Sequence, residues 1–99
     1  MYDMKNLAKL KTLEANAPDG WKGFVAFDKA AMAAGAVSVK YKELIALGVA
    51  FTTQCPYCIE IHAGRAREAG ATDQEISETV IVAALRAGGA MTHGTHALK

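Results

Sequence analysis

The two cysteines of this chain, Cys55 and Cys58, are separated by two residues, and His62 follows four positions after the second. Two thiols at this spacing can close a disulfide without moving the fold, which is the arrangement used in thiol–disulfide exchange. Pro56 suits the first turn of a helix, so we expect Cys55 at the cap, where free N–H groups and the helix dipole favour a thiolate. His62 would share a helix face with Cys58 and could take and return its proton. The segment therefore predicts a redox site.

Glu43 is the one acidic residue in an otherwise apolar stretch, and it precedes Cys55 by twelve positions. If the helices on either side of residues 52–54 form an antiparallel pair, Glu43 lies about 15 Å and His62 about 10 Å behind their common turn. The two side chains, alone or with a bridging water, can span that difference. We therefore expect a relay of Glu43, His62, Cys58 and Cys55 in which the glutamate orients the histidine.

Ordinary explanations exist for each member of this set. A glutamate in the first turns of a helix commonly complements the dipole and faces solvent. A histidine on a half-apolar helix is commonly a packed or surface residue. Buried free cysteines behave as small hydrophobes, but that does not explain a proline between two of them at a helix start. The cysteine pair is therefore the most specific part of the pattern.

Metal binding is a second chemistry open to these residues. The cysteine pair and His62 are ligand types that zinc accepts, but a structural zinc site takes four ligands, and His93 and His96 fall in a small, polar C-terminal tail. Two subunits could complete a site together, although the second ligand pair of ordinary zinc modules is missing. Haem attachment needs a histidine directly after the second cysteine, where Ile59 stands. We expect neither a metal nor another cofactor.

Composition limits the other function classes. The chain has 99 residues, of which 52% are hydrophobic, and it carries eleven Lys and Arg against ten Asp and Glu. One domain over residues 1–99 buries only about 60 to 65% of its unfolded surface, so this much apolar surface predicts a homo-oligomer whose interface continues the core. A compact monomer rich in alanine is the alternative. The balanced charge, without a basic stripe, argues against nucleic acid as a partner.

The sequence also bears on compartment. Residues 1–6 lack the apolar core of a signal peptide, and no stretch approaches the roughly 18 uninterrupted apolar residues of a membrane span. We expect a cytoplasmic protein without a membrane partner. In a reducing cytosol a lone cysteine pair is poorly explained as a structural staple, which leaves catalysis, redox sensing or metal binding.

The apolar spacing is helical almost throughout, without the alternation typical of strands, and predicts a compact all-α bundle of five to six helices. A first helix passes through residues 4–13 and ends in the turn at residues 16–20, where proline and glycine interrupt the pattern. A second follows that turn and ends at Gly35, with Phe24 and Phe27 on its inner side.

Three further helices would carry and surround the chemistry. Ser38 caps a helix that is apolar nearly all round and should be central. The next begins at Pro56 and runs to a glycine cap at Gly70. A capping box at residues 72–75 begins the last of the three. Gly88 and its neighbouring glycine either end it or allow another backbone to approach closely.

Glu43, the Cys55–Cys58 motif and His62, at these spacings, resemble the signature of the alkylhydroperoxidase D-like branch of the carboxymuconolactone decarboxylase family. The similarity continues through residues 63–66, the break at 70–72 and the helix at 75–87, so it covers about residues 20–92. The N-terminal helix and the C-terminal tail would then be peripheral. The resemblance implies an all-helical fold in trimers or hexamers, with the cysteine pair near subunit contacts, and reduction of hydroperoxides.

Carried onto this sequence, the resemblance implies that His62 and Glu43 activate Cys58, while Cys55 closes the disulfide and meets the reductant. The dipole argument favours Cys55 as the thiolate and the histidine spacing favours Cys58, so both assignments stay open. One thiolate would attack the hydroperoxide, the sulfenic acid would condense with its neighbour, and an external dithiol or thiol protein would restore the pair.

Two other functions are consistent with the same pattern. The other branch of the family decarboxylates a lactone, a reaction with no evident use for two neighbouring thiols. A non-enzymatic alternative is a helical oligomer whose disulfide reports redox state to a partner. Turnover with a hydroperoxide separates a catalyst from such a sensor.

Overall fold

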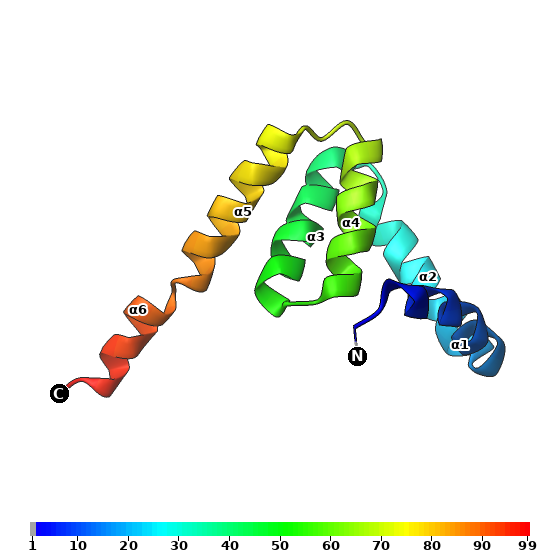
Figure 1. Ribbon diagram of the computed structural model, residues 1–99, viewed down its shortest axis with the longest axis horizontal. Coiled ribbons are helices and arrows are strands. Elements are labelled where there is room, and N and C mark those ends of the chain that lie inside the picture. Colours follow the sequence, from blue (N-terminus) through cyan, green and yellow to red (C-terminus); the bar gives the residue numbers. More distant parts are fainter. Residues whose placement is uncertain (1) are drawn as a thin grey trace.

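The computed structural model describes residues 2–99, and every regular element within that range is helical (Figure 1). Residue 1, which the predicted domain includes, lies outside the described range. The all-α prediction is confirmed. In chain order the elements are the 3-10 helix η1 (Met4–Lys9), α1 (Leu10–Asn16), α2 (Pro18–Met32), α3 (Val39–Thr53), α4 (Pro56–Glu68), α5 (Asp73–Ala87), α6 (Ala90–His93) and the 3-10 helix η2 (Gly94–Ala97).

The centre of the fold is α3, which packs against α4 on one side and α5 on the other (Figure 1). As predicted, Ser38 caps its start by accepting a hydrogen bond from the Tyr41 N–H at 3.3 Å. The short connection after Thr53 turns the chain back, so α3 and α4 form an antiparallel hairpin. The buried apolar residues of the described range come from this hairpin, from α5 and from the loop before it: Leu47, Ala50, Ala66, Ala71 and Ala83.

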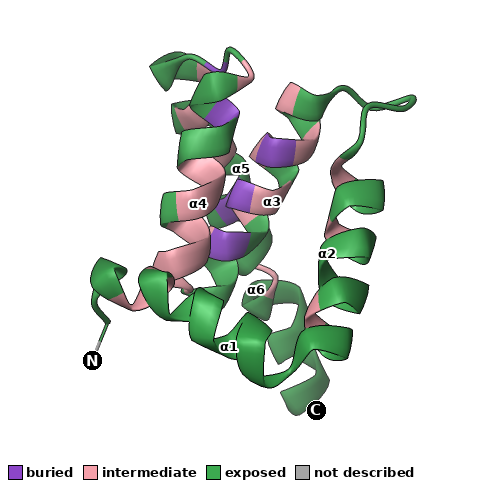
Figure 2. Ribbon diagram, turned by 90° about the vertical axis from the view of Figure 1, so that its right-hand side faces the viewer, coloured by how far each residue is buried: buried purple, intermediate pink, exposed green. Residues whose placement is uncertain are grey.

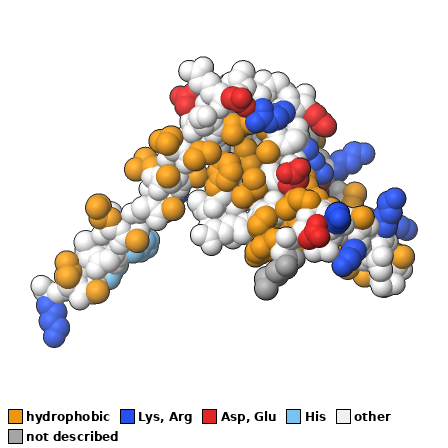
Figure 3. All heavy atoms as spheres, in the orientation of Figure 1, with side chains coloured by type: hydrophobic (Ala, Val, Ile, Leu, Met, Phe, Trp, Pro, Cys, Tyr) orange, Lys and Arg blue, Asp and Glu red, His pale blue; other side chains and the backbone are white. Residues whose placement is uncertain are grey.

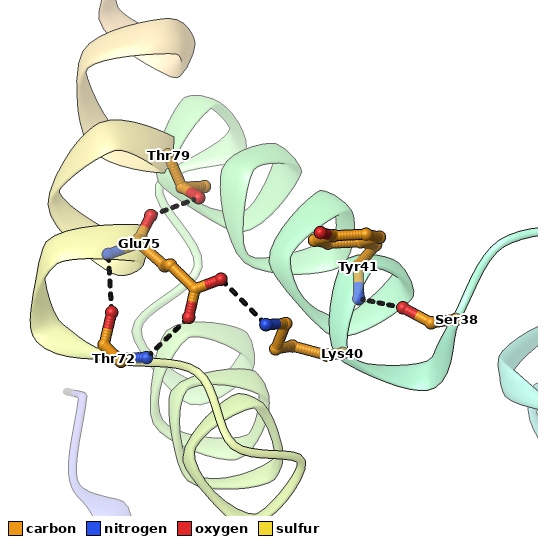
Figure 4. Close-up of polar contacts among 6 residues, drawn as sticks. All are labelled: Ser38, Lys40, Tyr41, Thr72, Glu75 and Thr79. Carbon is orange, nitrogen blue, oxygen red and sulfur yellow. Dashed lines mark hydrogen bonds and ion pairs between the residues drawn. The ribbon is translucent and has the colours of Figure 1, made fainter.

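The junction of α5 with α3 is built on the predicted capping box (Figure 4). The Thr72 hydroxyl accepts the Glu75 N–H at 3.1 Å, and the Glu75 carboxylate accepts the Thr72 N–H at 3.0 Å. The other oxygen of that carboxylate pairs with Lys40 of α3 at 2.8 Å (Figure 4). The hydrogen bond from Lys40, with a smaller contribution from the Thr72 N–H, holds the pKa of Glu75 below its ordinary value.

The N-terminal third differs from the prediction in its boundaries. The expected turn at residues 16–20 is wrong, because α2 begins at Pro18 and only Ala17 separates it from α1. Proline is favoured at the first helical position, where its missing N–H has no intrahelical partner to lose. The first helix is also divided, with a 3-10 segment over Met4–Lys9 before α1, and α2 ends at Met32 rather than at Gly35.

The described chain is more extended than the predicted compact bundle. Its radius of gyration is 16.5 Å, against about 13 Å for a compact domain of 100 residues. Its accessible surface is 7611 Å², against about 5,400 Å² for a folded monomer of this mass. Figure 2 shows why, since buried positions lie on and around the hairpin and α5 while α1, α2 and α6 are largely exposed. Phe24 and Phe27, predicted on an inner side, are 62% and 73% exposed.

No helix within residues 2–99 combines the length and the hydropathy that crossing a bilayer would require.

Candidate redox-active site

The turn between α3 and α4 fixes the position of the first cysteine. Gln54 adopts a left-handed conformation, with φ of 58°, and both its N–H and that of Cys55 donate to the Ala50 carbonyl, the latter at 3.2 Å. The Cys55 bond is the 6→1 bond of a Schellman motif and the Gln54 bond is the 5→1 bond of an αL cap, and together they close the end of α3. Cys55 therefore ends one helix and, in an extended conformation, caps the start of the next.

Cys55 and Cys58 form a disulfide, with their Cα atoms 5.3 Å apart. Cys55 Sγ accepts the Cys58 N–H at 3.3 Å, so the sulfur occupies the place of an N-cap acceptor. Pro56 stands at the first helical position, as the sequence predicts. The first turn of α4 thus brings the two sulfurs together and directs a backbone donor at one of them, which is the local setting that favours a thiolate after reduction.

Glu43 and His62 meet across the hairpin. Glu43 Oε2 lies 2.7 Å from His62 Nδ1, and no bridging water is needed because the antiparallel helices bring the two side chains level. Glu43 is the only buried polar residue in the described range, with 4% of its surface exposed. The explanation that it faces solvent at the start of a helix is therefore wrong.

The hydrogen bond between this pair assigns roles to the two imidazole nitrogens. An ionised carboxylate can only accept, so Nδ1 carries the hydrogen when Glu43 is charged, and Nε2 of the neutral ring is left as an acceptor. Burying a carboxylate is costly unless it is paired and hydrogen-bonded, and His62 is the only hydrogen-bond partner of Glu43 within residues 2–99. Each residue therefore holds the other in place.

The two pairs lie next to each other on α4. His62 follows Cys58 by four positions, which places their Cβ atoms about 5–6 Å apart on one face of the helix. With the disulfide closed, His62 makes no hydrogen bond to either sulfur within the described part of the chain. The structure thus brings Glu43 to His62 and Cys55 to Cys58, while the catalytic role of all four residues stays a prediction.

One feature of the site was not predicted. The hydroxyl of Tyr57, which stands between the cysteines, accepts hydrogen bonds from the Asn6 side-chain amide at 3.0 Å and from the Asp3 N–H at 3.2 Å. The Tyr2 ring lies edge-on to the Tyr57 ring, with centroids 5.8 Å apart. A signal was present in the sequence, because a partly buried tyrosine hydroxyl usually has a hydrogen-bond partner, but nothing indicated that the partner was the N-terminus.

A second unpredicted feature is an apolar groove of about 480 Å³ between α3 and α5. Figure 3 shows hydrophobic side chains gathered between the hairpin and the start of α5, with more of them along the projecting C-terminal part of the chain. The groove uses a different side of α3 from the one that carries Glu43. Its apolar lining includes Leu44, Ile45, Gly48, Val49, Val82 and Ala83.

No group of three or more His, Cys, Asp and Glu side chains within residues 2–99 is arranged to hold a metal ion. His93 and His96 lie in α6 and η2, in the C-terminal part of the chain, which projects away from the start of α4 (Figure 1).

Fold and site together define an all-helical protein with two neighbouring cysteines at a helix start and, one turn away, a histidine paired with a buried glutamate. Residues 18–99 match the sequence profile of the Carboxymuconolactone decarboxylase family. The chain belongs to this family, as the motif predicted.

Two relatives illustrate the similarity. A Paracoccus denitrificans protein described as "uncharacterized protein 4 in cox locus" is 49% identical over 76 residues, which are 76% of this chain and 68% of that protein. The crystal structure of an apo carboxymuconolactone decarboxylase family protein from Legionella pneumophila has a TM-score of 0.82 and 34% identity, covering 86% of this chain and 76% of that one. The second likeness supports the helical arrangement described above.

Proposed function

We propose that this protein is a thiol-dependent hydroperoxide reductase of the alkylhydroperoxidase D-like branch of the family. The observation that carries the proposal is the disulfide between Cys55 and Cys58 at a helix start, one turn from an imidazole held by a buried carboxylate. A lactone decarboxylase would have no use for the sulfur pair. The pair is partly exposed, so a small hydroperoxide and a reductant can reach it.

The cycle begins with the reduced pair. One thiolate attacks the hydroperoxide, so an S–O bond forms, the O–O bond breaks and an alcohol leaves after taking up a proton. The second thiol attacks the sulfenic acid, an S–S bond forms and water leaves. An external dithiol then exchanges with this disulfide, giving up two electrons and two protons and becoming oxidised itself. A reducing compartment such as the cytoplasm supplies dithiols of this kind.

His62 and Glu43 serve the proton transfers of that cycle. Nε2 of His62 accepts the thiol proton and returns it to the leaving alkoxide, while Glu43 stabilises the imidazolium that forms between these steps. General acid–base catalysis by a positioned side chain is typically worth about 10²- to 10⁴-fold in rate. The carboxylate does this without moving, because burial and its hydrogen bond already fix it.

The test is turnover by the purified protein. Cumene hydroperoxide and excess dithiothreitol are mixed with it, and alcohol formation and dithiol oxidation are followed together. We expect many equivalents of each per chain, in a one-to-one ratio. Oxidation of a single equivalent, with Cys55 and Cys58 trapped as the disulfide in the presence of dithiol, would contradict the enzyme and favour the redox sensor.

We also propose that the protein acts as a homo-oligomer, with a trimer or hexamer implied by the family resemblance. The accessible surface exceeds that of a compact monomer by about 2,200 Å², and large apolar side chains are exposed on both sides of the hairpin, among them Phe27 and Leu85. A second copy is the occupant that the α3–α5 groove requires in this arrangement. Light scattering at micromolar concentration tests it, and a stable monomer would contradict it.

A further inference from the structure

We infer that residues 2–9, here called the N-terminal strap, hold the cysteine turn in its disulfide form and so set the balance between disulfide and dithiol. The strap consists of Tyr2, Asp3 and η1. The inference builds on the proposed function only in treating the Cys55–Cys58 pair as redox-active. It assigns Tyr57 and Asn6 as positioning residues that act through the cysteine turn.

The strap reaches the site at one side chain. The Tyr57 hydroxyl accepts the Asn6 amide at 3.0 Å and the Asp3 N–H at 3.2 Å, and the Tyr2 ring covers the ring of Tyr57 edge-on. The strap is itself fixed at this point, because the Asp3 carboxylate caps η1 by accepting the Lys5 N–H at 2.9 Å. Figure 1 shows the N-terminus beside the end of α4 at which that helix begins.

The same turn carries both of the sulfurs whose separation changes with redox state. Two sulfurs joined by a bond lie about 2 Å apart, whereas two reduced sulfurs separate to roughly the 3.5–4.0 Å of non-bonded contact. Cys58 and Cys55 flank Tyr57 in the first turn of α4, so a shift of either residue moves the base of the tyrosine. In the disulfide form both strap hydrogen bonds to Tyr57 are made. Reduction of the disulfide therefore either weakens these two hydrogen bonds or is opposed by them.

The strap lies outside the part of the chain that matches the family profile. The family match begins at residue 18, whereas the four predicted site residues all lie within it. Residues 2–9 thus bring to the site two hydrogen bonds that come from outside the matched region. A device of this kind adjusts the redox balance of the pair without altering the groups that do the chemistry.

Thermodynamic linkage makes the inference quantitative. If the strap binds the disulfide form more tightly than the dithiol form, weakening the strap must lower the disulfide–dithiol equilibrium constant by the same factor. One net hydrogen bond corresponds to about a two- to tenfold change. A tenfold change shifts the two-electron potential by about 30 mV.

The first experiment compares Tyr57→Phe and Asn6→Ala with the parental full-length chain. Each protein is equilibrated in mixtures of reduced and oxidised dithiothreitol, and the disulfide fraction is read after acid trapping. We expect the disulfide to become about two- to tenfold easier to reduce in Tyr57→Phe and less so in Asn6→Ala. The matched controls are Tyr41→Phe and Asn16→Ala, because the side chains of Tyr41 and Asn16 make no hydrogen bond within the described range. Neither control should shift the disulfide–dithiol equilibrium.

The second experiment measures the reciprocal effect. Amide exchange of residues 2–9 in the parental protein should be faster in the reduced form than in the disulfide form by a factor similar to the shift in Tyr57→Phe. Equal exchange in the two forms, an unchanged equilibrium in both strap variants, or tighter disulfide in them would overturn the inference. Asn6→Ala leaves α4 intact, so the test survives if Tyr57→Phe folds poorly. No hydroperoxide is used, so failure of the peroxidase assay would leave these results unaffected.

Discussion

The α3–α4 hairpin and the C-terminal arm formed by the second half of α5, α6 and η2 use apolar residues in opposite ways. Leu47 and Ala66 of the hairpin have no exposed surface, and the buried Glu43 lies in the same interface. Leu85 and Met91 of the arm are 79% and 86% exposed. The interface between the two hairpin helices is therefore complete within one chain, whereas the arm presents a surface that one chain leaves uncovered.

This difference indicates where precise geometry is maintained. A hydrogen bond between a buried carboxylate and an imidazole needs neighbours that do not move, and packed hairpin residues provide them. The arm carries no member of the candidate site, so its position can depend on assembly without disturbing the chemistry. We expect substitutions in the hairpin to alter reactivity or folding, and those in the arm to alter association.

The largest expected effect comes from the sulfurs at the end of the hairpin. Cys58→Ser and Cys55→Ser should each reduce hydroperoxide-dependent oxidation of dithiothreitol to the uncatalysed background, because neither variant can close the intramolecular disulfide. Helical circular dichroism should be unchanged, since serine preserves the size of the side chain. Turnover that persisted in both single variants would show that the chemistry does not reside in this pair.

The next effect concerns the hydrogen-bonded pair of Glu43 and His62. His62→Gln and Glu43→Gln should each slow the reaction of the reduced protein with hydroperoxide by about 10²- to 10⁴-fold, because the first removes the proton acceptor and the second removes the carboxylate that stabilises the imidazolium. Stopped-flow measurement of thiol loss gives the rate directly. Glu60→Gln is the matched control, since Glu60 lies exposed on the same helix as His62. Parental rates in both site variants would rule out the relay.

The parts of the fold that the sequence predicts correctly depend on local chemistry. Ser38, Pro56 and the capping box at residues 72–75 mark three helix starts, because caps and proline act on the nearest turn of backbone. The meeting of Glu43 and His62 also follows from residue counting, once a short turn makes the helices antiparallel.

The features that the sequence did not predict depend on contacts between residues that are far apart in the chain. Apolar periodicity identifies the side of α2 that carries Phe24, but it does not say whether the same chain covers that side. No pattern in residues 2–9 indicates that Asn6 contacts a tyrosine 51 positions later. The turn before α2 was misjudged for another reason, since Pro18 is compatible both with a loop and with the first position of a helix.

A smaller effect, on the free energy of unfolding, distinguishes the hairpin from the arm when leucine is replaced by alanine in each. Leu47→Ala should lower the free energy of unfolding by about 2–5 kcal/mol, because it leaves a cavity where no surface was exposed. Leu85→Ala should change the free energy of unfolding of the dissociated chain, measured with urea, by less than about 0.5 kcal/mol. It should also weaken self-association. Equal losses of stability at the two positions would mean that the arm packs on its own chain in solution.

The smallest effect lies where the first turn of α5, from which the arm continues, meets the hairpin, because Glu75 there pairs with Lys40 of α3. The hydrogen bond from Lys40 holds the pKa of Glu75 below its ordinary value of 4.5. A carboxyl with a lowered folded-state pKa stabilises the fold above its unfolded-state pKa and loses that contribution as pH falls through the folded-state value.

Glu75→Gln keeps a side chain that suits the capping box but removes the charge. The parental melting temperature should therefore fall more than that of Glu75→Gln between pH 6 and the acid range below the ordinary value of 4.5. Glu78→Gln, at an exposed glutamate on the same helix with no ion pair in the described range, should keep the parental pH dependence. If Glu75→Gln also kept the parental pH dependence, the ion pair would not join the start of α5 to the hairpin in solution.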